Sequence, residues 1–138
     1  MEIRHYNNMT RTPALALAVE GWMWLVKKGH TDGGFVLNWE QKAILALREN
    51  AVPVGVLTWS DQPWNASVFV NLAYVKLAFR RTGVHTAMFD ALVERARELG
   101  RPTILSGAMK TNNVSRHAMK AQGRVEYAVM TKFDVPPA

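Results

Sequence analysis

The residues whose types and spacing most clearly indicate a binding site form a short basic turn. This turn lies between a β-rich run and a segment with helical periodicity. The run at residues 67–77 leads into Phe79-Arg80-Arg81-Thr82-Gly83, and the helical pattern begins at Val84. N–H groups in the first turn of a helix lack intrahelical partners and carry partial positive charge, so they bind anions. The two arginines add full charges, and Gly83 lets the backbone approach an anion closely. The turn therefore predicts a site for a phosphate-bearing ligand.

Hydrophobic periodicity and turn signals predict the elements that hold this turn in place. The predicted strands are residues 2–6, 43–47, 52–58, 67–77, 103–106 and 125–133, and the predicted helices are residues 13–28, 84–99 and 114–121. Antiparallel hairpins followed by a strand-helix-strand crossover indicate an α/β fold with a mixed central sheet of about six strands and helices on both faces. We expect one domain over residues 1–138.

Composition excludes several classes of protein. The chain has 138 residues, of which 49% are hydrophobic and 20% charged, which is ordinary for a compact water-soluble domain. It has no cysteine, so disulfides, thiolate zinc sites and a cysteine nucleophile are ruled out. The four histidines lack ligand spacing, so no metal site is predicted, and no G-x-S-x-G elbow indicates a hydrolase.

Charge and hydropathy narrow the choice of partners and location. The net charge of +6 favours anionic partners, but no basic arm or zinc-finger spacing indicates a specific nucleic-acid reader. The N-terminus lacks the apolar run of a signal peptide, and no apolar stretch is long enough to span a bilayer. We therefore expect a cytoplasmic protein without a membrane partner.

Two segments resemble the signatures of the GNAT superfamily of N-acetyltransferases. Around the basic turn, Arg80 and Gly83 match the first two defined positions of R/Q-x-x-G-x-G/A, and His85 stands at the third. Further on, residues 112–123 resemble N-x-x-A-x-x-x-Y-x-x-x-G-F, with the asparagine and the glycine eleven positions apart. The order of predicted elements is also similar to the family along nearly the whole chain.

The resemblance implies a site for acetyl-coenzyme A as co-substrate. Its pyrophosphate would lie on the amides of the basic turn, and its pantetheine arm would pair with the preceding strand, where the parallel strands 67–77 and 103–106 splay apart. An asparagine at the start of the following helix would bond the arm from the other wall. The cofactor-binding residues implied are Val75, Leu77, Arg80, Arg81, Thr82, Gly83, Val84, His85, Asn112, Asn113 and Ser115.

The chain departs from the family pattern where the chemistry takes place. Met119 replaces a tyrosine that protonates the leaving thiolate, and methionine donates no proton. The strand 67–77 has no carboxylate; Asn71 lies near the usual glutamate and would hold a water that accepts the amine proton. The N–H of Leu77 would polarise the thioester carbonyl. Other catalytic candidates are Tyr74, His117 and Tyr127, and Trp39 and Trp64 are candidates for lining an acceptor pocket.

Three functions follow from these observations. The first is an N-acetyltransferase that moves an acetyl group from acetyl-coenzyme A to a primary amine by direct attack in a ternary complex. The second is a GNAT-like protein that has lost catalysis and acts by binding another protein, as Met119, Asn71 and His85 allow. The third, a nucleic-acid binder, has charge but no recognition motif. The acceptor is a small molecule or a protein, and the resemblance allows a homodimer.

Overall fold

The structure is a computed structural model that describes residues 1–30, 40–107, 112–126, 134, 136 and 137. Three sequence predictions fall outside these residues: most of the strand at 125–133, and the positions of Trp39 and Tyr127. No helix in the described ranges is both long enough and apolar enough to cross a bilayer.

One mixed sheet forms the centre of the fold, with five described strands in the order β1-β2-β3-β4-β5. The first four are antiparallel neighbours, and β4 pairs with β5 in parallel. This arrangement confirms the predicted hairpins and crossover; the sixth expected strand lies largely beyond the described residues. The strands are β1 (Glu2–Tyr6), β2 (Lys42–Arg48), β3 (Val52–Gln62), β4 (Ser67–Val75) and β5 (Thr103–Ser106).

Three α-helices join or follow these strands, each ended by the signals seen in the sequence: α1 (Pro13–Lys27), α2 (Val84–Leu99) and α3 (Asn113–Ala121). Gly29, Gly100 and Gly123, which follow them, all have positive φ, which glycine adopts without steric cost. Thr12 precedes α1 in extended conformation, but its hydroxyl donates to the Met9 carbonyl rather than capping the helix. Short 3₁₀ turns are η1 (Glu49–Ala51), η2 (Pro63–Asn65) and η3 (Leu77–Phe79).

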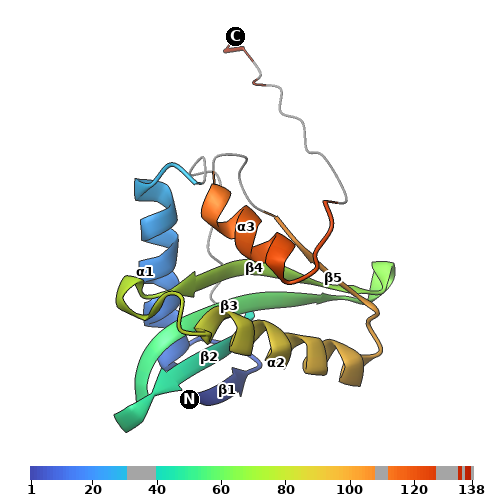
Figure 1. Cartoon of the computed structure of the whole chain (residues 1–138). Helices are drawn as coiled ribbons and strands as arrows, with labels where there is room; N and C mark the ends of the chain where they lie inside the picture. The colour runs from blue at the N-terminus through green and yellow to red at the C-terminus, as the bar shows by residue number, and fades with distance from the viewer. Residues whose placement is uncertain (31–39, 108–111, 127–133, 135, 138) are drawn as a thin grey trace.

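Helices cover both faces of the sheet, as predicted (Figure 1). The α1 face carries one apolar core that includes Leu17, Leu45 and Leu72, and the α2 face carries a second that includes Val70 and Met88. Each face of the sheet therefore packs against a helix through its own apolar core.

Strand β4 contains one extra residue at its middle. On β3, the adjacent Thr58 and Trp59 pair with Leu72 and Val70, so Asn71 has no opposite residue and forms a β-bulge. Val70 belongs to the core on the α2 face and Leu72 to the core on the α1 face. The bulge therefore shifts the alternation of side chains along β4 by one residue, so that Val70 and Leu72 point to opposite faces of the sheet.

Two glycines allow helices to lie close to the sheet. A Cβ at Gly21 of α1 would come within 2.6 Å of the Tyr74 Cβ, and a Cβ at Gly55 of β3 would come within 2.7 Å of the Val84 Cγ1. Real Cβ contacts are essentially never shorter than 3.0 Å. Gly55 therefore sets how closely the first turn of α2 approaches the sheet.

Candidate active site

The basic turn forms a compact corner between β4 and α2. The strand ends at Val75, two residues before the predicted end, and Leu77 begins the 3₁₀ turn η3. Arg81 and Gly83 both have left-handed backbones, with φ of 62° and 86°. A left-handed backbone is uncommon for arginine, and such strained residues persist where the surrounding structure fixes their conformation. Among the described residues nothing lies within 4 Å of a Cβ built on Gly83, so a ligand has room there.

Arg48, at the end of β2, brings a further cation to this corner. Its Nη2 donates to the Thr82 hydroxyl at 2.9 Å, although the two residues are 34 positions apart. Its Nε is buried and has no partner among the described residues. The first turn of α2 thus carries free amides, the nearby Arg81 and a guanidinium from β2, a combination suited to an anion.

Arg80 lies away from the helix amides, on the α1 side of the sheet. Its Nε donates to the Val75 carbonyl at 3.0 Å, and its guanidinium carbon lies 4.4 Å from the centre of the Trp24 ring. Trp24 in turn contacts Tyr74, with ring centroids 6.2 Å apart. The first motif residue therefore ties the turn to α1 and occupies a carbonyl that the resemblance assigns to the pantetheine arm.

The parallel strands are paired along only part of β4. Their pairing covers Ser67–Val70 and Thr103–Ser106 and stops there, while β4 continues to Val75. The second half of β4, from the bulge at Asn71 onward, has no described strand on this side. In Figure 1, β5 diverges from β4, and α3 lies in front of the two strands in this view. The point where the strands separate, at Val70 and Ser106, is called the fork below.

The start of α3 is fixed by the asparagine of the second motif. Asn112 is buried, and its side-chain oxygen accepts a hydrogen bond from the Ser115 N–H at 3.3 Å, a helix cap. Asn113, the first residue of the helix, is exposed. Of the two asparagines predicted to bond the pantetheine arm, Asn112 thus has its oxygen engaged in the cap, and Asn113 is open to solvent.

His85 joins α2 to the end of α3 instead of lying exposed at the helix start. Its Nδ1 lies 2.8 Å from the Gln122 side-chain nitrogen. Burial lowers the pKa of His85, and the charge of Arg124 lowers it further. The imidazole is therefore neutral near pH 7, with Nδ1 accepting from the Gln122 amide. The bulky side chain at the third motif position is directed to α3, and a protonated imidazole that helps to bind an anion is not favoured.

Arg124 stands at the position of the aromatic residue in the family pattern and packs against an aromatic ring. Its guanidinium carbon lies 4.0 Å from the centre of the Phe89 ring, and its Nη1 donates to the Ser106 hydroxyl at 2.8 Å. The Arg124 N–H bonds the Met119 carbonyl at 3.1 Å, as part of the glycine-terminated end of α3. Burial lowers the pKa of the guanidinium, and its Nε is buried without a described partner.

The catalytic candidates lie on and around the second half of β4. The Asn71 nitrogen donates to Ser60 on β3 at 2.8 Å, so a water would be held by its amide oxygen. Tyr74 is buried, and both this burial and the Glu20 carboxylate raise the pKa of the phenol. Leu77 is exposed and Met119 is half-buried. His117 and Trp64 are exposed on α3 and η2.

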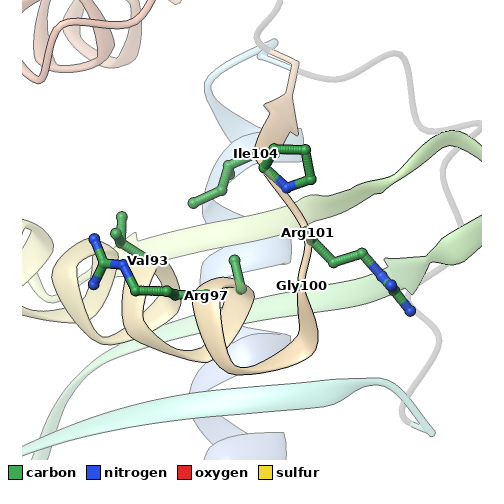
Figure 2. A pocket seen from close by; sticks show the side chains of 7 residues that line it. Val93, Arg97, Gly100, Arg101 and Ile104 are labelled. Atoms are coloured by element: carbon green, nitrogen blue, oxygen red, sulfur yellow. The ribbon is translucent and has the colours of Figure 1, made fainter.

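A surface hollow lies at the other end of α2, far from the basic turn (Figure 2). Its lining includes Val93, Arg97, Arg101 and Ile104. Both arginines are already paired, Arg97 with Glu94 and Arg101 with Asp61. Because Val93 follows Gly83 by ten residues, the hollow begins roughly 15 Å along the helix from Gly83. It is therefore separate from the basic turn.

The fold and the site define an α/β protein with a basic turn at the start of α2, beside a parallel strand pair that is joined along only part of its length. The family model described as "Acetyltransferase (GNAT) family" matches residues 12–123. The chain therefore belongs to the GNAT acetyltransferase family. A comparison with curated protein sequences finds no match.

Solved structures of acetyltransferases share the fold. An aminoglycoside acetyltransferase from an uncultured soil metagenomic sample, in complex with sisomicin, has a TM-score of 0.72 at 15% identity, covering 98% of this chain and 96% of that one. An aminoglycoside N-acetyltransferase in complex with CoA gives 0.64 at 21%, covering 97% and 93%. The ribosomal-protein-alanine N-acetyltransferase from Brucella melitensis biovar Abortus 2308 gives 0.64 at 17%, covering 99% of both chains.

Several residues around the site were not predicted from the sequence. Arg48 reaches the turn from another strand, and Trp24 holds Arg80. Gln122 bonds His85, and Arg124 reaches the fork. None of them belongs to a local pattern that indicates binding; the departure of Arg124 from the family pattern was the one available signal.

Proposed function

We propose that the protein transfers an acetyl group from acetyl-coenzyme A to a primary amine. One observation carries the proposal: an edge of β4 that pairs with no described strand leads from the fork to the basic turn. An extended arm with two amide groups is the natural partner for a free strand edge, and a helix N-terminus is the natural partner for its phosphates. Family membership supports the same reading.

The length of the β4 edge beyond the fork suits a phosphopantetheine arm. The arm has about as many chain atoms as a four-residue peptide, which spans roughly 13 Å at ~3.3 Å per residue. Five residues of β4, from Asn71 to Val75, form the unpaired edge. An arm that begins at Gly83 and follows this edge brings its sulfur close to the fork. For Val75 to pair with the arm, Arg80 must first release the Val75 carbonyl.

The reaction then proceeds by direct attack. The amine nitrogen adds to the thioester carbonyl, the carbon–sulfur bond breaks, and the amine proton passes to a water held at Asn71. Because no carboxylate lies on β4, most of the rate enhancement comes from holding the two reactants together, which is worth several kcal/mol. The N–H of Leu77 and the phenol of Tyr74 remain candidates for polarising the carbonyl and contacting the acceptor.

The acceptor is proposed only as a primary amine. Two solved relatives of the fold are described as aminoglycoside acetyltransferases and one as a ribosomal-protein-alanine N-acetyltransferase. A useful acceptor panel therefore includes aminoglycosides, simple polyamines and peptides with a free N-terminal alanine.

Binding and turnover are tested separately. Saturating acetyl-coenzyme A should raise the melting temperature, since a ligand at 100 times its dissociation constant stabilises by about 2.7 kcal/mol. Thiol release in the presence of the acceptor panel then measures transfer. An absence of any stabilisation at millimolar cofactor refutes the proposal. Stabilisation without thiol release for any amine or protein pool favours the binding-protein alternative.

A further inference from the structure

The fork holds a permanent cation that the reaction as described above does not use. Arg124 lies beside Ser106, the last residue of β5, and its Nη1 donates to the Ser106 hydroxyl at 2.8 Å. Ser106 pairs with Val70, directly before the bulge. The guanidinium thus lies at the fork, which is where the arm of the cofactor would end under the proposed function.

Nothing described around Arg124 neutralises its charge. Its bonding contacts are the Phe89 ring and the Ser106 hydroxyl, and no carboxylate within the described ranges forms an ion pair with it. Its Nε is buried without a described partner. A partly buried guanidinium without an ion-pair partner and a buried donor without an acceptor both disfavour the folded state. An anion that forms at the fork would satisfy both the charge and the donor.

This chain also lacks the proton donor that the family pattern provides for the departing sulfur. Met119 stands where a tyrosine protonates the departing sulfur, and a thioether donates no proton. The Met119 carbonyl accepts the Arg124 N–H at 3.1 Å, so the two residues are held together by the end of α3. Met119 and Arg124, which both depart from the family pattern, are therefore joined by a backbone hydrogen bond.

We propose that Arg124 is a catalytic residue that stabilises the thiolate of coenzyme A as it leaves. This inference rests on the proposed function. In the step, the amine nitrogen forms a bond to the carbonyl carbon, and the carbon–sulfur bond breaks with its electron pair on sulfur. The amine proton leaves to water, and the thiolate is held by the guanidinium until water protonates it. The arginine keeps its proton throughout.

The other charged and titratable groups near the fork do not duplicate this role. From α2, His85 is neutral near pH 7 because burial and then Arg124 lower its pKa. From β4 and the turn, Tyr74 and Arg80 lie together on the α1 face, at the opposite end of the free edge. Arg124 is therefore the group whose removal should change the acidity of a thiol at the fork.

The decisive variant is Arg124→Phe, which removes the charge and restores the aromatic residue of the family pattern. Phenylalanine can stack on Phe89, so the packing of α3 on α2 is retained. Arg124→Lys keeps the charge without the planar guanidinium group. Arg97→Gln removes an exposed, ion-paired arginine far from the site. Thermal melts with and without coenzyme A show that each variant is folded and binds.

The readout is the pKa of the thiol of bound coenzyme A, followed by thiolate absorbance against pH. An opposite charge within about 4–6 Å lowers a pKa by about 1–3. We expect the bound thiol to be about one to two pH units less acidic in Arg124→Phe than in the wild type, partly restored in Arg124→Lys and unchanged in Arg97→Gln. In turnover, Arg124→Phe should lower kcat about 10- to 100-fold with little change in coenzyme A affinity. With a thioester of a more acidic thiol, the difference in kcat between the wild type and Arg124→Phe should be smaller, because such a thiolate leaves more readily without a cation.

Three results overturn the inference, and each is distinct. Equal thiol pKa values in the wild type and Arg124→Phe, with coenzyme A bound to both, remove the thiolate role and leave the proposed function intact. Weaker binding of coenzyme A by Arg124→Phe, with an unchanged thiol pKa, assigns Arg124 to the phosphates. Failure of the wild type to bind coenzyme A refutes the proposed function, and the inference falls with it.

Discussion

Gly55→Ala should weaken the binding of coenzyme A although residue 55 contacts no ligand. The new Cβ would lie 2.7 Å from Val84 Cγ1 and 3.1 and 3.2 Å from the Met88 Cε and Sδ. Carbon atoms pack at about 3.5–4.0 Å, so the first turn of α2 must move by about 0.8 Å or more. Crowding of this kind costs about 1–3 kcal/mol in the free energy of unfolding. Because Val84 starts the helix whose amides are proposed to bind the phosphates, we expect the Kd for coenzyme A to rise about tenfold, or ~1.4 kcal/mol.

Gly21→Ala is the matched control on the other face of the sheet. Its Cβ would lie 2.6 Å from Tyr74 Cβ, so a similar loss of stability is expected, but the crowding falls on α1 and leaves the turn unmoved. Chemical denaturation gives the stability of both variants, and calorimetric titration of coenzyme A gives the Kd. An unchanged Kd in Gly55→Ala, or an equal rise in both variants, would refute the reasoning.

Three further predictions concern the turn and its neighbours. Gly83→Val should abolish the coenzyme A-dependent rise in melting temperature, because a β-branched residue is strained at φ 86° and fills the space above the amides; Gly29→Val, strained at φ 70° but remote, should keep the rise. Arg48→Met should raise the Kd for coenzyme A about tenfold at low salt and less in 0.5 M NaCl, measured by titration, since a cation beside the proposed phosphate site is lost. Below about pH 6.5 the unfolded His85 imidazole binds a proton that the folded state disfavours, so stability should fall as pH falls, and His85→Gln should reduce this slope in pH-dependent denaturation; an unchanged slope would contradict the lowered pKa.

The helices and most of the strands were predictable because their signals are local. The apolar spacing of α2 and its terminal Gly100 are read within a single segment, and the same holds for the hairpin of β2 and β3. The end of β4 was placed two residues too far, since Leu77 continues the apolar pattern although the chain turns after Val75. Side-chain pattern alone does not reveal where the backbone leaves the sheet.

The elements of the candidate site were predictable only where a motif lies within one segment. The turn at Arg80 to Gly83 and the helix start at Asn112 were located in that way, while their binding roles stay predictions. Arg48 bonds Thr82 from 34 positions away, and Arg124 bonds Ser106 from 18. Such contacts depend on the order and register of the strands, which no single segment encodes. The direction of Arg80 towards Trp24 is likewise a result of packing between elements.

The single bulged residue of β4 separates the packing of the domain from the pairing of the strand. Because Asn71 shifts the side-chain alternation by one, its deletion would leave Val70 on the α2 face and Leu72 on the α1 face, with both cores filled as before. The residue opposite none on β3 is therefore one that the two apolar cores do not require, and a change at this position acts on the backbone beside the fork without exposing a core residue.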